Sequence, residues 1–201
     1  MPATRRSQAE RRATSERTLL RVAARLIAER RSTQFTFAEL AREAGCSHGL
    51  PHYLFGSKVK MLEALVHELA DRVGTHMLVP AVGTATGRDA LLAALRAAVG
   101  NLEHPNESTT ALWVLVGEAI GSSPELQPAL ADYHASVLAR LRALLEAARD
   151  AGDVRADLDT DAYATVVLAT IRGLGVLRIT NPDTFTPAIA TTFIATVERA
   201  L

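Results

Sequence analysis

A pattern of helix caps over residues 35–58 constrains this chain more than any other feature. Thr36 and Glu39 have the spacing of a capping box, in which each side chain binds the backbone amide of the other residue. Gly45 follows at a position where a short helix would end in the left-handed backbone region. The pattern therefore predicts two short helices joined by a tight turn, a helix-turn-helix.

Helical segments on both sides can cover this motif. A stripe of apolar residues predicts a first helix over roughly residues 15–31. Ser47 can cap the second helix of the motif, beginning at His48, and Ser57 can cap a long helix that follows. Three helices around one apolar cluster are therefore expected over residues 15–60.

The rest of the chain consists of apolar helical segments separated by Pro, Gly and Asn. The composition is 48% hydrophobic and rich in Ala and Leu, and no stretch shows the alternation of a strand. Residues 80–87 hold one Pro and two Gly and predict a break. The expected fold is all-α with about nine helices, the later ones at about 88–103, 108–121, 125–151, 160–180 and 186–200.

The charge is divided unevenly along the chain. The 22 basic and 22 acidic residues cancel overall, but residues 1–60 hold 12 Lys and Arg against 5 Glu, and the remainder is acidic. A basic module can replace the counterions of a phosphate backbone, so DNA is the expected partner. We therefore divide the chain into a disordered basic arm (1–14), a DNA-binding helix-turn-helix domain (15–60) and a C-terminal domain (61–201).

Several classes of protein are disfavoured. The single Cys46 excludes an internal disulfide framework. The first residues lack the apolar core of a secretion signal, and charges interrupt the longer apolar stretches, so no membrane partner is expected. No nucleophile elbow, phosphate loop, zinc signature or spaced carboxylate pair is present. The sequence thus predicts a cytoplasmic protein that is not an enzyme and needs no cofactor.

The segment from about Leu19 to Leu65 resembles the TetR family of bacterial transcriptional regulators. The resemblance rests on Leu40-Ala41, Ala44-Gly45, Ser47, Gly49, Tyr53, Phe55 and Ser57-Lys58 in fixed register. It implies a homodimer whose helix-turn-helix domains bind a palindromic operator, and a C-terminal domain that binds a small effector and releases the DNA.

Three positions depart from the usual pattern of that family. Arg31 stands where the first helix often ends in Gly, and Leu54 replaces a His or Tyr that commonly contacts phosphate. Pro51 would occupy the fourth position of a helix that starts at His48, where it loses one backbone hydrogen bond and can distort the first turn.

The resemblance places the DNA-contacting side chains in the second helix of the motif and at the helix starts beside it. His48 and His52 are four residues apart and can donate to guanine, while Leu50 can pack on a thymine methyl. The same two histidines could instead bind a metal, but no third ligand lies nearby, so no metal is expected. The expected DNA-binding set is Thr36, Ser47, His48, Gly49, Leu50, His52, Tyr53 and Lys58.

The candidate effector site rests on charged and aromatic residues within apolar helices. Glu118 and Arg172 are charges inside apolar runs, which is costly unless they are paired or line a cavity. Both could also face solvent or pair with a neighbour. The expected effector-binding set is Trp113, Glu118, Tyr133 and Arg172, and few hydroxyl or amide groups accompany it, which favours an apolar or amphipathic effector.

A dimer interface is expected on the last two helices. Small residues in the first of them would allow close approach, and the second carries an apolar stripe, although packing within one subunit would produce the same stripe. The expected interface residues are Gly173, Val176, Leu177, Ile189, Phe193 and Val197.

Two other functions remain open at this point. A DNA-binding regulator or activator without an effector would need no large C-terminal domain, and an enzyme is the more remote alternative. The sequence leaves open which promoter and effector are involved, and whether the protein represses or activates.

Overall fold

A computed structural model describes residues 8–201, and this range is all-α, without strands, as predicted. The α-helices are α1 (Gln8–Arg30), α2 (Phe37–Ala44), α3 (Leu50–Phe55), α4 (Lys58–Arg72), α5 (Val79–Val82), α6 (Gly87–Glu103), α7 (Glu107–Ile120), α8 (Gln127–Asp150), α9 (Thr160–Thr180) and α10 (Pro187–Ala200). A π-helical segment lies at Val73–Leu78, and single 3-10 turns lie at Pro124–Leu126 and Pro182–Thr184. Because α4, the π-helical segment and α5 are continuous, they form one rod, and counting the rod as one helix gives the nine helices expected over the described residues.

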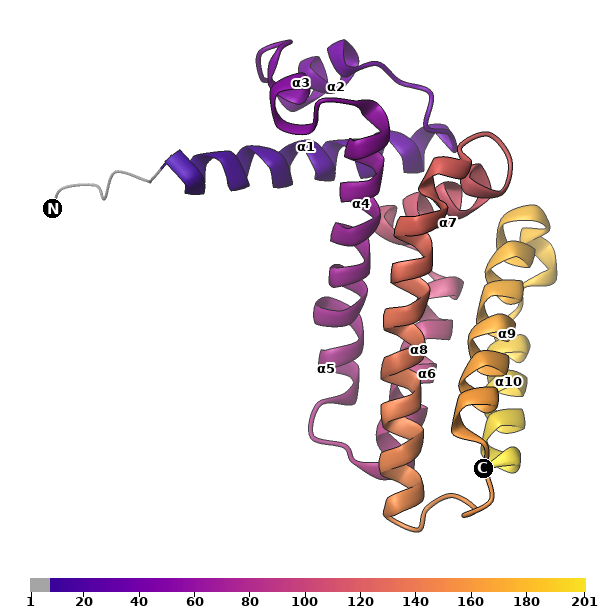
Figure 1. The fold of residues 1–201 in the computed structure, drawn as a ribbon. Coiled ribbons are helices and arrows are strands. Elements are labelled where there is room, and N and C mark those ends of the chain that lie inside the picture. Colours follow the sequence, from indigo (N-terminus) through magenta and orange to yellow (C-terminus); the bar gives the residue numbers. More distant parts are fainter. Residues whose placement is uncertain (1–7) are drawn as a thin grey trace, which may run out of the picture.

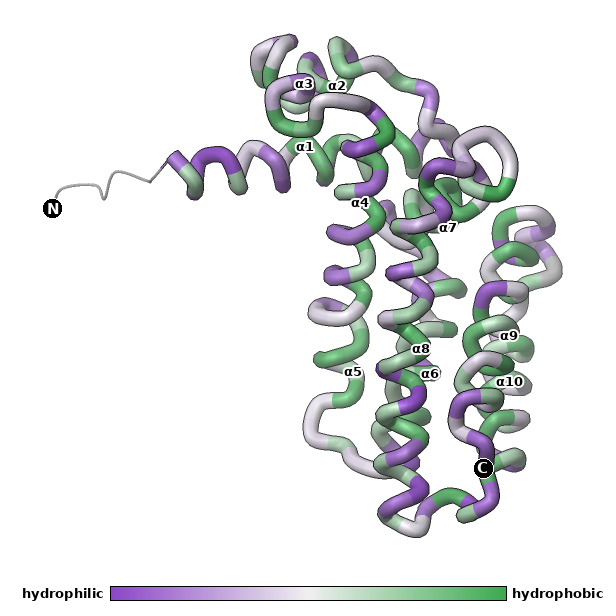
Figure 2. Tube along the Cα trace, viewed as in Figure 1, coloured by the Kyte–Doolittle hydropathy of each residue, from purple (hydrophilic) through white to green (hydrophobic). Residues whose placement is uncertain are grey.

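The molecule divides into a head (α1–α3) and a body (α6–α10), and the rod that begins with α4 connects them. Figure 1 shows α1 lying across one end of the bundle, with α2 and α3 above it and the long helices of the body below. The apolar residues gather where α1 meets the bundle and between the long helices, while the outer half of α1 is hydrophilic (Figure 2). The free end of α1 is thus a mainly polar helix that extends beyond the bundle.

The helix caps of the head form as the sequence predicts. The Thr36 hydroxyl accepts from the Glu39 amide at 3.1 Å, and the Glu39 carboxylate accepts from the Thr36 amide at 2.8 Å. Gly45 ends α2 with a φ of 65°, and the Ser57 hydroxyl accepts from the Lys60 amide to begin α4. These local signals determine where α2 and α4 start, and α2 stops where the glycine allows it to.

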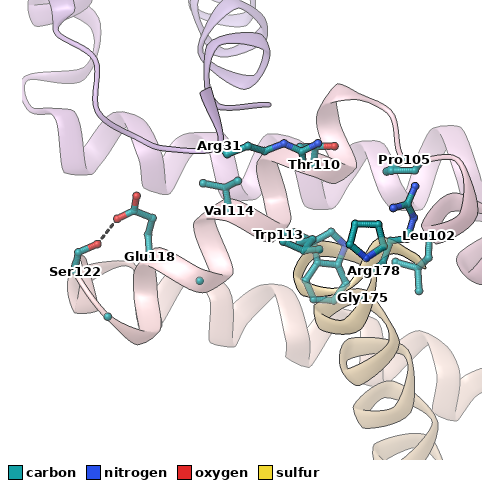
Figure 3. A pocket seen from close by; sticks show the side chains of 14 residues that line it. Arg31, Leu102, Pro105, Thr110, Trp113, Val114, Glu118, Ser122, Gly175 and Arg178 are labelled. Carbon is teal, nitrogen blue, oxygen red and sulfur yellow. Dashed lines mark hydrogen bonds between the residues drawn. The ribbon is translucent and has the colours of Figure 1, made fainter. Parts of the chain in front are cut away.

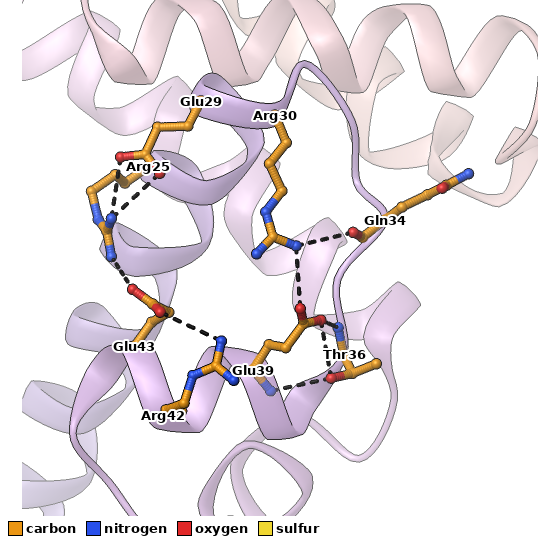
Figure 4. Close-up of polar contacts among 8 residues, drawn as sticks. All are labelled: Arg25, Glu29, Arg30, Gln34, Thr36, Glu39, Arg42 and Glu43. Carbon is orange, nitrogen blue, oxygen red and sulfur yellow. Dashed lines mark hydrogen bonds and ion pairs between the residues drawn. The ribbon is translucent and has the colours of Figure 1, made fainter.

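Ion pairs fasten α1 to α2 on the outside of the head (Figure 4). Arg25 pairs with Glu43 at 3.0 Å and with Glu29 at 3.1 Å, and Arg30 reaches Glu39 at 3.5 Å. All five side chains are at least partly exposed, so each pair contributes little by itself. Their effect is to hold the orientation of α2 relative to α1.

Four expectations about the head need correction. α1 begins at Gln8, so residues 8–14 of the expected disordered arm are helical, and residues 1–7 lie outside the described residues. α3 begins at Leu50, with Gly49 as its cap residue; Ser47 contributes its carbonyl to a turn, accepting from the Leu50 amide, and caps nothing. Pro51 therefore stands in the first turn of α3, where its missing amide costs no helical hydrogen bond.

The turn after α1 is left-handed although Arg31 stands where the family often has glycine. Arg31 has a φ of 55°, the only positive φ among the described residues other than glycine. A side chain in this region costs about 1 kcal/mol, so the head carries a small strain at the point where α1 leads into the helix-turn-helix.

Two apolar cores meet at α7. One core joins the head to α4, α7 and the start of α8, and the other lies among α6, α8, α9 and α10. Leu112 and Leu115 belong to the first core, whereas Trp113 of the same helix belongs to the second. α7 is thus the element through which the head and the body share their packing.

α9 has the length and mean hydropathy of a membrane-spanning helix, a feature that the sequence reading did not identify. It packs along α8 and α6 on one side, and Arg172 lies within its apolar run. Its opposite side carries exposed Val166, Val176 and Leu177.

We expect Gly175→Ala to destabilise the fold. A Cβ atom at Gly175 would overlap the indole of Trp113, which lies directly on the α9 backbone there. Overpacking of this kind costs about 1–3 kcal/mol. Gly100→Ala in α6 is the matched control, because a Cβ there meets nothing within 4 Å. Thermal and urea denaturation should lower the stability of the first variant alone, and equal behaviour of the two would contradict the packing described.

Candidate DNA-binding head and effector cavity

The expected DNA-contacting residues form an exposed surface at the turn and at α3. Ser47, His48 and Gly49 are exposed in the turn before α3, and Tyr53 is 69% exposed on the helix itself. The His52 ring stands edge-on to Phe37, with the ring centroids 4.8 Å apart, and its Nδ1 lies 3.3 Å from the Gly56 carbonyl oxygen. His52 is therefore held in one orientation on an exposed surface.

Two members of the expected set are placed differently from the prediction. His48 precedes α3, so it does not share a helix face with His52. Leu50 is partly buried and, with Leu54, lines a groove against the first turns of α1. Its expected contact with a thymine methyl stays a prediction.

The sequence analysis missed the contribution of α1 to this surface. The Arg12 guanidinium lies over the Tyr53 ring, 5.7 Å from its centroid. Arg12 was assigned to a disordered arm, whereas the helix carries it to α3. The signal that could have found it is the continuation of helix-forming residues upstream of Ser15.

The anchoring residues at the helix starts are partly engaged within the chain. The Thr36 hydroxyl is occupied by the capping box, although the residue is exposed. The Lys58 ammonium lies over the Phe35 ring, 4.9 Å from its centroid. Burial lowers the pKa of Lys58, and the charges of Glu118 and Glu39 oppose that change. Lys58 thus lies at the junction of head and body in this structure.

Glu118 connects the body to the head rather than lining the interior cavity. Its carboxylate accepts from the backbone amide of Thr33, in the connection between α1 and α2, at 3.4 Å, and it also accepts from the Ser122 hydroxyl. The Ser122 bond is the main cause of the lowered pKa of Glu118, and the Thr33 amide and the charge of Lys58 act in the same direction. Glu118 thus lies between the two domains and outside the interior cavity, although it borders the larger cleft beside Trp113, and its role as an effector ligand stays a prediction.

The other three expected effector residues meet inside the body. The guanidinium carbon of Arg172 lies 5.2 Å from the ring centroid of Trp113 and 4.9 Å from that of Tyr133. These residues line a cavity of about 80 Å³ whose walls come from the π-helical segment, α6, α7, α8 and α9. Leucine, valine and methionine side chains form most of the remaining wall. A concave, mostly apolar space with a few polar groups is the usual form of a small-molecule site.

A second, larger hollow lies on the other side of Trp113. It is an open cleft of about 1050 Å³ bordered by α7, the end of α9 and the turn after α1. In Figure 3, Trp113 extends between α7 and Gly175 of α9, with Arg178 beside it and Glu118 and Ser122 at the far end of the cleft. Trp113 thus separates the interior cavity from a cleft that reaches Arg31 of the head.

The expected interface residues divide into exposed and buried ones. Gly173, Val176 and Leu177 lie on the outer face of α9. Phe193 and Val197 are packed in the core of the same subunit, and Ile189 is partly buried. The stripe on α10 is therefore a core stripe, which corrects its assignment to a dimer interface; the free apolar face is on α9.

No group of three or more potential metal ligands occurs within residues 8–201. His48 and His52 therefore find no third donor in the described part of the chain.

A helix-turn-helix head on a helical body that contains an interior cavity is the architecture of helix-turn-helix transcriptional regulators. Two family models match the chain: that of bacterial regulatory proteins of the tetR family, over residues 19–65, and that of the C-terminal part of BetI-type transcriptional repressors, over residues 87–201. The chain therefore belongs to the TetR family, with a C-terminal domain of the BetI type. This confirms the resemblance seen in the helix-turn-helix segment.

Individual relatives agree with this assignment. The transcriptional regulator BetI of Rhizobium meliloti is 29% identical over 133 residues, which cover 64% of this chain and 65% of that protein. The alignment thus spans just under two thirds of the length of that curated relative. A TetR-family regulator from Rhodococcus sp. has the same fold, with a TM-score of 0.80 at 21% identity over 93% of this chain and 98% of that one. A regulator from Saccharomonospora viridis in complex with choline has a TM-score of 0.73 at 21% identity, over 93% and 95% of the two chains.

The contact between Glu118 and Thr33 should depend on pH. Because the folded protein lowers the pKa of Glu118, its ionised form contributes stability above the unfolded value of about 4.3, and this contribution is lost as the pH falls below that value. Glu118→Gln should therefore melt at a lower temperature than the wild type at pH 7, and the difference should narrow towards pH 3.5. Glu125→Gln, an exposed position nearby, is the control. A difference that stays constant with pH would contradict this role of the carboxylate.

Proposed function

We propose that this protein is a repressor that binds a palindromic operator as a homodimer and is released by a small effector. The observation that supports this most strongly is the juxtaposition of an exposed, basic helix-turn-helix head with a body that contains an apolar cavity. The two share α7 and the rod that starts with α4. Such a protein acts in the cytoplasm, where it meets DNA. No catalytic role is part of the proposal.

The dimer is proposed to form through the outer face of α9. Val166, Val176 and Leu177 leave 61%, 49% and 43% of their surface exposed, and Gly173 lies among them. Exposed apolar side chains on one helix face are typical of a surface that a partner covers. A second copy of this helix would bury that face and place two heads on one two-fold axis.

In the proposed complex, the turn before α3 and the exposed side of α3 enter the major groove. Gly49 supports this placement, because its φ of −80° and the empty space around it mean that nothing within the chain requires a glycine there. A residue without a side chain allows close approach of a DNA strand. His48, His52 and Tyr53 are the exposed side chains that accompany it.

The effector is proposed to bind in the cavity at Trp113, Tyr133 and Arg172. Val73 and Met77 of the π-helical segment line the same cavity. That segment directly continues α4, which begins beside the head. Effector binding can therefore change the rod and with it the spacing of the two heads. By linkage, an effector that weakens operator binding must itself be bound more weakly when operator is present, by the same factor.

A footprint on DNA selected by the purified protein tests the function. Two heads on a two-fold axis require half-sites about one helical turn apart, or a multiple of that distance. We expect a near-palindromic footprint and an affinity that falls steeply with salt. Leu177→Glu should abolish both the dimer and the footprint, whereas Val79→Glu, at an exposed position on the rod, should leave them unchanged. A monomer-sized, asymmetric footprint would contradict the proposal.

Base reading and phosphate anchoring should separate at His52 and Lys58. His52→Ala should cost about 1–3 kcal/mol and relax preference at one base position in each half-site. Lys58→Met keeps the packing over Phe35 but removes the charge, so it should weaken binding to all sequences similarly and reduce the salt slope. Binding to a panel of single mismatches measures both. If the two variants behaved alike across the panel, the assignment of roles would be wrong.

A further inference from the structure

The interior cavity carries positive charge without a counterion. Arg172 and Arg140 both contribute to its wall, and no Asp or Glu does. None of the ion pairs in the described part of the chain involves either arginine. Arg140 is exposed to solvent, but Arg172 is partly buried and its Nε is fully buried, and a charge withdrawn from water is costly unless something compensates it. The cavity therefore lacks a negatively charged group to pair with its arginines.

Arg172 is also held ready for such a group. Its guanidinium lies over the rings of Trp113 and Tyr133, which fixes its plane in the cavity wall. Its Nε is buried and has no hydrogen-bond partner among the described residues. A guanidinium with a free buried donor matches a carboxylate, which can accept two parallel hydrogen bonds from it.

The same arrangement disfavours a cationic effector. Stacked aromatic rings can bind a quaternary ammonium group, but here the chain's own guanidinium occupies both rings. A cationic ligand would have to displace Arg172 and would add a third positive charge to a space already lined by two arginines. An anion meets neither obstacle.

We propose that the cavity binds a small organic acid, whose carboxylate pairs with Arg172 and whose apolar part lies against Leu141, Leu168 and Ile171. The inference rests on the proposed function, because it names the chemical class of its effector. The volume of about 80 Å³ restricts the ligand to a small one, such as a short aliphatic or a single-ring acid. Arg140, whose guanidinium packs against Gly74 of the π-helical segment, adds positive charge at the side of the rod.

Binding to the protein without DNA tests this inference separately from the proposed function. The probes are pentanoate, its neutral amide pentanamide, and propyltrimethylammonium, which have equal numbers of heavy atoms, with benzoate and benzamide as a second shape. Calorimetry, melting temperature and the fluorescence of Trp113, the single tryptophan, are the readouts. We expect at least one acid to bind at millimolar concentration or better, and at least tenfold more tightly than its amide and than the cation.

Variants of α9 provide the matched controls. Arg172→Met should weaken binding of the acid at least tenfold and should melt at the same or a higher temperature than the wild type, because it removes a buried charge without a counterion. Arg178→Met, on the same helix but in the open cleft, should bind the acid as the wild type does. The inference is overturned if neither acid binds, if amide or cation binds as well as the acid, or if acid binding survives in Arg172→Met. If any of these results is accompanied by a specific operator footprint, the inference fails but the proposed function stands. If the acid binds but no footprint forms, the inference stands and the proposed function fails.

Discussion

The packing of α1 across α4 and α7 is the contact on which the rest of the structure depends. Ala23 and Ile27 of α1 are completely buried, and Leu65 and Leu115 meet them from α4 and α7 in the same core. A head of three helices, one of them only six residues long, could bury little apolar surface by itself. The head is therefore stable because the body completes its core, and any movement of α4 or α7 must be transmitted to it.

Three connections carry that transmission, and they differ in kind. The rod is covalent and continuous, the shared core is apolar, and the Glu118 bond to the Thr33 amide is electrostatic. The rod is π-helical where it lines the cavity. A π-helical turn is less favourable than an α-helical one, and such turns occur frequently at functional sites. A change in the cavity can thus alter the winding of the rod at low cost, while the cores on either side keep their packing.

Local signals in the sequence predicted the elements well. Caps, glycines and breaks depend on a few neighbouring residues, and Thr36, Gly45 and Ser57 act in the structure as their spacing indicated. The start of α3 was misplaced because Ser47 is a good cap by type, while the turn after Gly45 uses its carbonyl instead. The extent of α1 was underestimated, because a polar helix supported by its own propensity gives no apolar period to detect.

The sites were harder to predict, because a sequence shows which residues are unusual but not what they face. Trp113, Tyr133 and Arg172 were selected as unusual and do meet in one cavity. Glu118 was selected for the same reason and faces the head. Phe193 and Val197 form an apolar stripe whose sequence pattern fits a core or a dimer interface equally well. Only their packing in the body core, where α10 lies against α6, distinguishes these two interpretations.

The uncompensated charge in the cavity has a thermodynamic consequence for regulation. A guanidinium that is withdrawn from water without a counterion lowers the stability of the effector-free body, and the packing of the surrounding leucines offsets this loss. An anion that supplies the counterion stabilises only those conformations of α9, α8 and the rod in which Arg172 can reach it. Because Trp113 lies against Arg172 on one side and against the α9 backbone at Gly175 on another, a shift of the guanidinium cannot occur without a response of α7. α7 in turn carries both Leu115, which packs in the core of the head, and Glu118, which accepts from the Thr33 amide in the connection between α1 and α2. In the proposed mechanism, the charge that is costly in the cavity therefore lies where its neutralisation by an effector would act on the DNA-binding head.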